Sequence, residues 1–160
     1  MSLINSTIKP FSAQAFKDGK FVTVTDADLK GKWAVVFFYP ADSTPVCTAE
    51  VCMFRDVAQD LADAGARVVG VSPQSSDSKA RFATRHNVTF PLLADTEGTW
   101  GRAFGVSMFF GLLTRRATFL LDPSGKILDR VVADLTLGAH RRLLERVTQR
   151  RESAAGRRST

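Results

Sequence analysis

The sequence predicts an α/β fold in which a central mixed β-sheet is flanked by helices. Strand-like and helix-like segments alternate along the chain, without repeats or long linkers. The run 33–39 is apolar or aromatic at every position, as a central strand covered by helices on both faces should be. Residues 122–125, Asp-Pro-Ser-Gly, have the composition of a tight turn between two strand-like runs. They predict an antiparallel hairpin at one end of the sheet.

The chain has 160 residues, of which 44% are hydrophobic and 24% charged, a composition that suits one domain with its own core. We expect this domain to span residues 1–150, followed by a basic tail at 151–160. Strands are predicted where Val, Phe and Ile are enriched, at residues 21–24, 34–39, 68–72, 118–121 and 127–132. Helices are predicted at residues 45–64, 77–86, 96–104 and 139–150.

The first helix is expected to begin at Pro45, because a missing N–H costs nothing at the first helical position and the ring presets φ. Thr44 is then the natural N-cap, since a residue before proline favours the extended backbone that an N-cap needs. Gly65 is the expected terminator. The apolar stripe of this helix is expected at Val46, Met53, Val57 and Leu61.

Charge and hydropathy argue against several classes of partner. Residues 1–139 hold 15 Lys/Arg and 14 Asp/Glu, a net charge of +1, whereas residues 140–160 hold 7 Arg and 2 Glu, a net charge of +5. Because no aromatic residues interleave these arginines, we expect a solvated helix end and a polar tail and no nucleic-acid partner. The apolar runs are far shorter than the roughly 18 residues of a membrane helix, and no signal pattern opens the chain. These features predict a soluble, cytoplasmic protein without a membrane partner.

The cysteine and histidine counts argue against a disulfide framework and a structural metal. Two cysteines, Cys47 and Cys52, and two histidines, His86 and His140, are too few for either. The sequence also has no Gly-rich loop for phosphate, so no bound cofactor is expected. His86 and His140 fall in helical runs away from the cysteines, and we expect them at the surface or at helix ends.

Cys47 lies where chemistry is expected in an α/β sheet, between the carboxyl end of a strand and the start of a helix. As the third helical residue, its sulfur would lie near free backbone N–H groups and the positive end of the helix dipole. Both favour a thiolate, which is a nucleophile. Packing in the core is the alternative for a lone cysteine. The strand end, the cap and a second cysteine nearby favour the nucleophile.

Cys52 follows five residues later. In an unbroken helix the two α-carbons would be roughly 8 to 9 Å apart, and a disulfide rarely spans more than about 7 Å. Cys47 and Cys52 can therefore pair only if the first helical turns unwind. The alternative is that Cys52, next to Met53 and Phe54, is a core thiol.

The pattern Pro40-x-x-x-Thr44-x-x-Cys47 resembles the active-site motif of the peroxiredoxins. The spacing of four residues between the cysteines is similar to that of the bacterioferritin-comigratory-protein, or Q-type, branch. This resemblance implies a thioredoxin-like fold and a thiol-dependent peroxidase. It extends over most of the chain, at residues 31–40, 54–56, 71–73, 90–95, 104–106 and 116–125.

The resemblance also implies roles for individual residues. Cys47 would attack one peroxide oxygen and become a sulfenic acid. Thr44 would hydrogen-bond the thiolate and the peroxide, and Pro40 would shield the site from water. Arg116 would stabilise the thiolate and the charge on the leaving oxygen. Arg115 should point the other way by strand alternation, and would take this role if the register were shifted by one residue.

In the Q-type branch the second cysteine resolves the first within one subunit, so Cys52 would form an intramolecular disulfide with Cys47. Thioredoxin or a similar dithiol would then reduce it. The typical two-cysteine mechanism, in which a C-terminal cysteine of the partner subunit resolves the first, is ruled out because no cysteine follows residue 52. A monomer or a weak homodimer is expected. A one-cysteine peroxidase that uses an external thiol remains open if Cys52 is structural. Glu50 also matches the branch and would orient the arginine, unless it is a solvated helix residue.

A function of another class is a binding or chaperone-like module. It would use the apolar stretch 108–113 and the Arg-rich tail. Packing in the core or at a dimer interface explains that stretch more simply.

Overall fold

The computed structural model of the chain describes residues 3–42, 44–63, 65–108, 113–133 and 138–147. The tail expected at 151–160 and the last three residues of the helix expected at 139–150 lie outside the described residues. Residues 109–112 of the apolar stretch also lie outside them. The two ends of that stretch, Met108 and Leu113, are 36% and 40% exposed.

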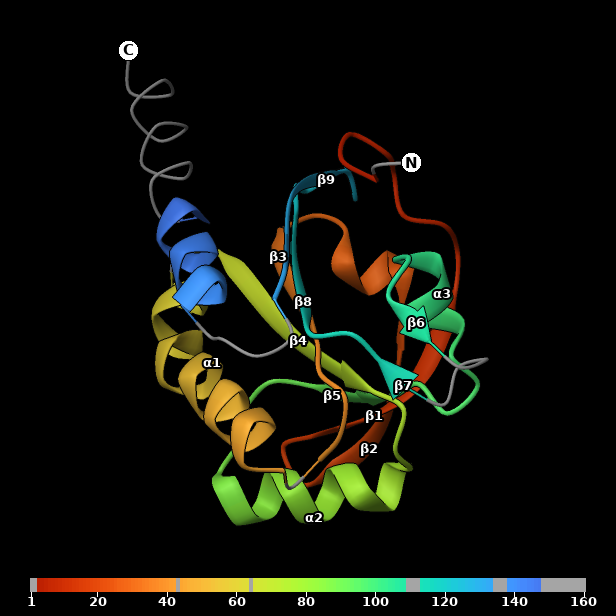
Figure 1. The fold of residues 1–160 in the computed structure, drawn as a ribbon, viewed down its shortest axis with the longest axis vertical. Helices are drawn as coiled ribbons and strands as arrows, with labels where there is room; N and C mark the ends of the chain where they lie inside the picture. The colour runs from red at the N-terminus through yellow and green to blue at the C-terminus, as the bar shows by residue number, and fades with distance from the viewer. Residues whose placement is uncertain (1–2, 43, 64, 109–112, 134–137, 148–160) are drawn as a thin grey trace.

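A seven-stranded sheet forms the centre of the fold, with the strand order β2-β1-β5-β4-β3-β8-β9 (Figure 1). β4 pairs in parallel with β3 and β5, and the remaining pairs are antiparallel, so the predicted mixed sheet is confirmed. The strands are β1 (Ser12–Lys17), β2 (Lys20–Thr25), β3 (Trp33–Phe38), β4 (Ala66–Ser72), β5 (Leu92–Ala94), β8 (Ala117–Leu121) and β9 (Ile127–Val132). A separate two-stranded sheet contains β6 (Ser107–Met108) and β7 (Leu113–Thr114).

Two strands of the main sheet, β1 and β5, were not predicted. β1 reads Ser-Ala-Gln-Ala-Phe-Lys, which has little of the β-branched character that marks a strand. Its partners β2 and β5 define it, through antiparallel pairing on both sides. β5 is only three residues long and follows Pro91, so it offers too short a pattern to recognise.

The hairpin predicted at residues 122–125 is confirmed, and it joins β8 to β9. The Asp122 carboxylate accepts hydrogen bonds from the backbone N–H groups of Ser124, at 2.9 Å, and Lys126, at 3.0 Å. Desolvation raises the pKa of Asp122, but the hydrogen bond from the Ser124 hydroxyl and these two backbone bonds outweigh it, and the net pKa is lowered. Gly125 has a φ of +85°, a conformation that glycine adopts without strain.

The helices are α1 (Pro45–Asp63), α2 (Ser76–His86), the short α3 (Thr99–Ala103) and the 3-10 helix η1 (Asp26–Leu29), and residues 138–147 are also helical. The prediction of a helix over 96–104 was wrong at its start. The Asp95 carboxylate accepts the N–H groups of Trp100 and Gly101, and Gly98 has a φ of +72°. These contacts form a turn at 95–98, so the helix begins only at Thr99.

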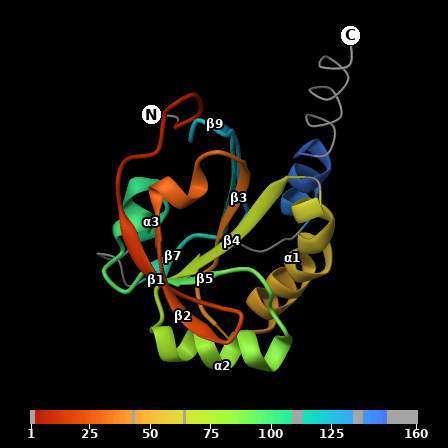
Figure 2. The ribbon, with the colours of Figure 1, turned by 180° about the vertical axis from the view of Figure 1, so that it is seen from behind.

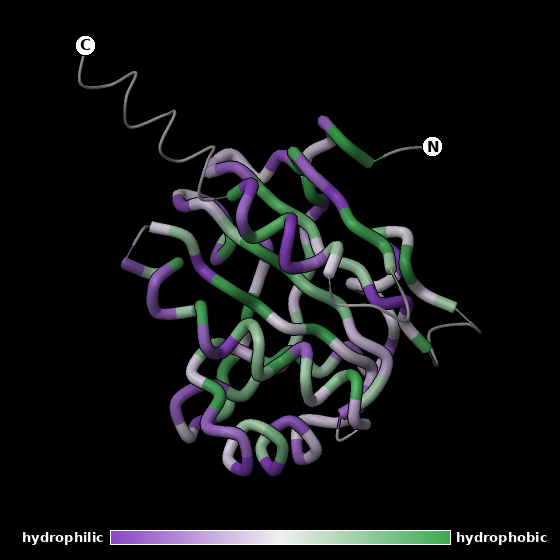
Figure 3. The backbone as a smooth tube through the Cα atoms, turned by 60° about the vertical axis from the view of Figure 1, so that its left-hand side comes forward, coloured by the Kyte–Doolittle hydropathy of each residue, from purple (hydrophilic) through white to green (hydrophobic). Residues whose placement is uncertain are grey.

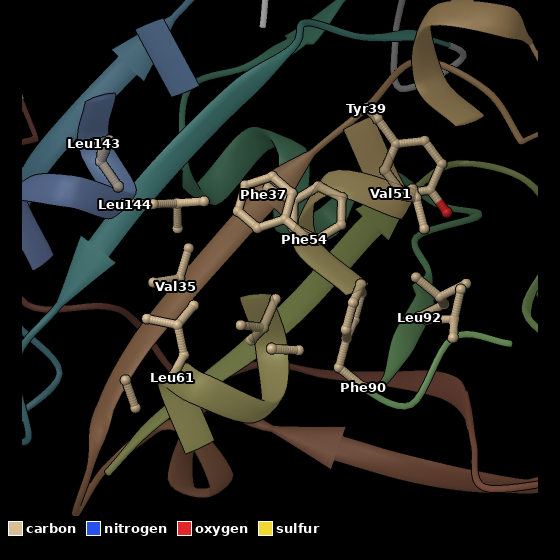
Figure 4. Close-up of a cluster of buried hydrophobic side chains, with 14 of the residues drawn as sticks. Val35, Phe37, Tyr39, Val51, Phe54, Leu61, Phe90, Leu92, Leu143 and Leu144 are labelled. Atoms are coloured by element: carbon tan, nitrogen blue, oxygen red, sulfur yellow. The ribbon is translucent and has the colours of Figure 1, made fainter. Parts of the chain in front are cut away.

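Helices cover both faces of the sheet. α1, α2 and the helix at 138–147 pack against one face, while η1 and α3 pack against the other. Figure 2 shows the same layers from behind, with α1 and α3 on opposite sides. On the α1 face, the rings of Phe37 and Phe54 stack with their centroids 4.0 Å apart (Figure 4). On the α3 face the core includes Trp100, Phe104 and Phe119.

The buried stripe of α1 differs from the predicted one. Val46 is 41% exposed, and Met53 and Val57 lie only at the margin of the core. Figure 3 shows the apolar segments of the chain concentrated in the interior strands. The residues of α1 that face the core follow the helical period but include a cysteine and a glutamate: Cys47, Glu50, Val51, Phe54, Ala58 and Leu61.

Candidate active site

Cys47 lies in the first turn of α1, directly after the loop that follows the carboxyl end of β3. α1 begins at Pro45, and the Thr44 carbonyl accepts the N–H of Thr48 at 2.8 Å, so Thr44 stands at the N-cap position, as predicted. Cys47 is therefore the third helical residue. The residue is only 1% exposed, and it belongs to the first helical turn, whose backbone N–H groups have no partner within the helix.

Arg116 is the group that meets the Cys47 sulfur. Its Nη2 donates a hydrogen bond to Sγ of Cys47 at 3.2 Å. Arg116 directly precedes β8, and the antiparallel register of β8 with β3 places Ala117 opposite Phe38. The guanidinium is thereby brought to the end of β3 where α1 begins. Arg115 is half-buried, and its backbone N–H donates to the carbonyl of Val106 at 2.9 Å.

Glu50 completes this group one helical turn after Cys47. Nη1 of Arg116 donates to Oε2 of Glu50 at 2.6 Å, and both side chains are buried. Of the two alternatives for Glu50, burial excludes the solvated helix residue, and the contact with Arg116 agrees with the other. Burial raises the pKa of Glu50 to about 7, against the opposing effect of Arg116. Burial lowers the pKa of Arg116, but the hydrogen bonds and charges of Glu50 and Cys47 outweigh it and the net pKa is raised.

The other two predicted residues flank the same loop. Thr44 is exposed, and its hydroxyl donates a long hydrogen bond of 3.4 Å to the carbonyl of Ala41. Pro40 is half-buried, and its carbonyl accepts a hydrogen bond from Nε2 of Gln74 at 3.0 Å. Gln74, in the connection between β4 and α2, therefore holds the backbone of Pro40 in place.

Cys52 is half-buried, and both cysteines are free thiols. α1 is continuous from Pro45 to Asp63, so it contains both cysteines in one helix. Helical geometry then separates their α-carbons by about 8 to 9 Å, which is beyond the usual span of a disulfide. A bond between Cys47 and Cys52 requires local unwinding of α1.

A buried polar cluster that the sequence analysis missed surrounds Asp42 in the same loop. Nζ of Lys79 lies 2.9 Å from Oδ2 of Asp42, and the two side chains are 0% and 3% exposed. Burial lowers the pKa of Lys79, although Asp42 opposes the shift. Burial and Asp42 together raise the pKa of Tyr39, whose hydroxyl donates to Oδ1 of Asp42 at 2.6 Å. One signal existed, because Lys79 shares a helical stripe with Phe82 and Ala83.

His140 is also fully buried, so the surface position that was one of its two expected places was wrong. It is the third described residue of the helix at 138–147, which agrees with the other expected place, a helix end. Its Nδ1 is bonded to the hydroxyl of Thr118 at 2.7 Å, and its Nε2 donates to the carbonyl of Ala133 at 3.0 Å. The N–H of Ala133 in turn donates to the carbonyl of Arg116 at 3.1 Å. His140 therefore ties the last described helix to the strands that carry Arg116.

No helix in the described ranges is long and apolar enough to cross a bilayer. No group of three or more His, Cys, Asp or Glu side chains within those ranges could hold a metal ion.

Comparisons with known proteins relate this arrangement to one family. The AhpC/TSA family matches residues 4–130 of the chain. "Peroxiredoxin Q, chloroplastic" of Sedum lineare is 42% identical over 123 residues, which cover 76% of this chain and 64% of that protein's length. "Peroxiredoxin Bcp" of Bacillus subtilis is 40% identical over 114 residues, covering 66% of this chain and 71% of that protein. The crystal structure of Enterococcus faecalis AhpC superposes with a TM-score of 0.88 at 31% identity, and covers 98% of this chain and 96% of that chain.

Proposed function

Because this chain belongs to the AhpC/TSA family of peroxiredoxins, thiol-dependent peroxidases with a thioredoxin-like fold, we propose that it reduces hydroperoxides with Cys47 as the nucleophile. The contact of 3.2 Å between Nη2 of Arg116 and Sγ of Cys47 is the observation that carries the proposal. A guanidinium at this distance stabilises the thiolate before the attack. It also stabilises the negative charge that develops on the leaving oxygen.

The first step is an in-line displacement at one peroxide oxygen. The sulfur of Cys47 forms a bond to this oxygen, the O–O bond breaks, and the leaving oxygen takes a proton. The products are the Cys47 sulfenic acid and water, or an alcohol when the substrate is an organic hydroperoxide. The thiolate loses two electrons, and the peroxide gains them. Pro40 shields the site from bulk water. Thr44 gives up its long hydrogen bond of 3.4 Å to the Ala41 carbonyl and turns its hydroxyl to the thiolate and the peroxide.

The second step is resolution by Cys52. Its thiol attacks the sulfenic sulfur, a disulfide forms, and water leaves. The first turns of α1 must unwind for this step, because the two cysteines are too far apart in the intact helix. A dithiol protein such as thioredoxin then reduces the disulfide by thiol exchange, which returns both cysteines to thiols. Such recycling needs a reducing compartment, and we place the enzyme in the cytoplasm, as a monomer or weak homodimer.

Peroxide consumption by three proteins tests this mechanism. Wild type, Cys47→Ser and Cys52→Ser are assayed with hydrogen peroxide and with cumene hydroperoxide, using thioredoxin and its reductase as the electron source. Wild type should turn over both substrates, and Cys47→Ser should consume neither. Cys52→Ser should complete the first attack but lose thioredoxin-dependent turnover.

Three outcomes would change the proposal. Turnover by Cys47→Ser would remove Cys47 from its role. Full thioredoxin-dependent turnover by Cys52→Ser would replace resolution by Cys52 with a one-cysteine mechanism that uses the external thiol. Complete inactivity of folded, reduced wild type would instead favour a binding module.

A further inference from the structure

The loop that carries Pro40 and leads to Cys47 is attached to the rest of the fold by a buried ion pair. Oδ2 of Asp42 accepts from Nζ of Lys79 at 2.9 Å and from the hydroxyl of Ser78 at 2.6 Å. Oδ1 accepts from the hydroxyl of Tyr39 at 2.6 Å, and the Ser72 oxygen lies 3.4 Å away. The Asp42 carboxylate is therefore satisfied on both oxygens, by residues of α2 and by Tyr39, which directly follows β3.

A second set of hydrogen bonds, centred on Gln74, holds the backbone of the same loop. The N–H of Asp42 donates to Oε1 of Gln74 at 3.0 Å, and Nε2 of Gln74 donates to the carbonyl of Pro40 at 3.0 Å. The hydroxyl of Ser72 donates to the same Oε1 at 2.7 Å, which orients the amide. Pro40 and Asp42 are thus tied to the β4–α2 connection at two separate points.

These contacts do not suit chemistry of their own. Lys79 and Ser72 are hydrogen-bonded to one another, as in a serine–lysine pair, but both side chains are fully buried and closed to substrate. The carboxylate of Asp42 also favours the charged ammonium, which is no base. An ion pair in the core is seldom more stabilising than well-packed apolar side chains, so its effect on position is the more informative one.

We propose that Asp42, Gln74 and Lys79 are positioning residues that fix residues 40–42, shortly before α1, so that the first turn of α1 presents Cys47 to Arg116 during the attack on peroxide. We call these three residues the loop clamp. Its hydrogen bonds join residues 39–42 to residues 72–79, and so they need not break when residues 45–52 unwind. The loop clamp therefore acts on the first step and stays closed during resolution. This inference rests on the proposed peroxidase function.

Variants that each remove the contacts of one side chain test the loop clamp. Ser78→Ala removes one hydrogen bond to Asp42, and Gln74→Met removes the ties to the loop backbone. Ser124→Ala is the matched control, because its hydroxyl also donates to an aspartate, Asp122, at 2.6 Å but in the β8–β9 turn. Lys79→Met deletes the cation, and Lys79→Arg restores it.

Each reduced protein, shown to be folded by circular dichroism, is mixed with one equivalent of hydrogen peroxide and quenched at intervals. Trapping with dimedone measures sulfenic acid formation, and intact mass measures disulfide formation. We expect Ser78→Ala and Gln74→Met to slow the first step by about 10-fold, since small displacements of reacting groups cost rate steeply. Lys79→Met should slow it further and Lys79→Arg should recover most of the rate. The second step should stay within about twofold of wild type in every variant, and Ser124→Ala should match wild type in both steps.

The proposed function and the loop clamp can be overturned separately. A wild-type protein that does not react with peroxide would overturn the proposed function itself. Wild-type activity with an unchanged first step in Ser78→Ala and Gln74→Met would overturn only the loop clamp. A slower second step in those variants would also overturn it, because it would mean that the clamp takes part in resolution. If Lys79→Met does not fold, the rates of the first step in Ser78→Ala and Gln74→Met still test the loop clamp.

Discussion

Two buried ion pairs lie next to the segment that carries Cys47, and they are hydrogen-bonded differently. In the first, Arg116 bridges Oε2 of Glu50 and the sulfur of Cys47, while the buried Oε1 of Glu50 has no hydrogen-bond partner in the described structure. In the second, both oxygens of Asp42 accept hydrogen bonds, including one from Lys79. One pair is incompletely satisfied and touches the reacting atom, and the other is satisfied and supports the loop before it.

The pair of Arg116 and Glu50 can change during the reaction, whereas the contacts of Asp42 and Lys79 can stay as they are. Glu50 lies on α1, three residues after Cys47, so unwinding of the first turns would separate it from Arg116. Its pKa of about 7 also allows it to change charge near neutral pH. Asp42 and Lys79 lie outside α1, and their contacts persist.

The largest expected effect is on the pair that touches sulfur. Arg116→Met should lower the second-order rate constant with hydrogen peroxide at least about 100-fold, because one donor to developing charge is lost. The variant also carries Glu50→Gln, because Arg116→Met alone would leave the Glu50 carboxylate buried without its cation. Arg115→Met is the matched control and should stay within about twofold of wild type. Equal losses in the Arg116 and Arg115 variants would contradict the assignment of Arg116. Stopped-flow competition for peroxide measures the rate constants.

The next effect is on stability and concerns the satisfied pair. Lys79→Met should lower the free energy of unfolding by about 3 kcal/mol, because it leaves the Asp42 carboxylate buried without its cation. The control is Lys30→Met, which removes a pair with Asp26 at 4.0 Å in which the lysine side chain is 42% exposed. That change should cost less than about 1 kcal/mol. Urea denaturation measures both, and similar losses would mean that burial of the pair has no consequence.

A smaller effect is the pH dependence that Glu50 introduces. Its folded pKa of about 7 is raised above the ordinary value of 4.5, so between these values the folded state holds a proton that the unfolded state has lost. Stability from this group is therefore greatest below pH 4.5 and falls as the pH rises towards 7. The decrease should be roughly 1 to 3 kcal/mol.

Glu50→Gln removes this titration, so it isolates the effect. The free energy of unfolding in urea should change less between pH 5 and pH 7.5 in the variant than in wild type. All other titrating groups are the same in the two proteins. An identical change in both proteins would show that Glu50 keeps an ordinary pKa in the folded state.

The position of Cys47 follows from local rules, and for that reason it could be predicted from the sequence. Pro45 and Thr44 define the start of α1. Arg116 was predicted from the resemblance to the peroxiredoxin motif, and strand alternation indicated only that Arg115 points the other way. Glu50 and Lys79 were harder, because a charged residue at a buried helical position gains its partner only when distant segments pack together. β1 and β5 were missed for the same reason, since their pairing partners define them and their own composition does not.

The most direct test of the central claim is the intact mass of the reduced protein after one equivalent of hydrogen peroxide, with Cys47→Ser and Cys52→Ser in parallel. The account predicts a loss of about 2 Da in wild type, absent in both variants and without a covalent dimer, together with a gain of about 16 Da in Cys52→Ser. The loss would establish the disulfide between Cys47 and Cys52. A wild-type mass that does not change, or an oxidation that persists in Cys47→Ser, would contradict the claim that Cys47 is the peroxide-reducing thiol.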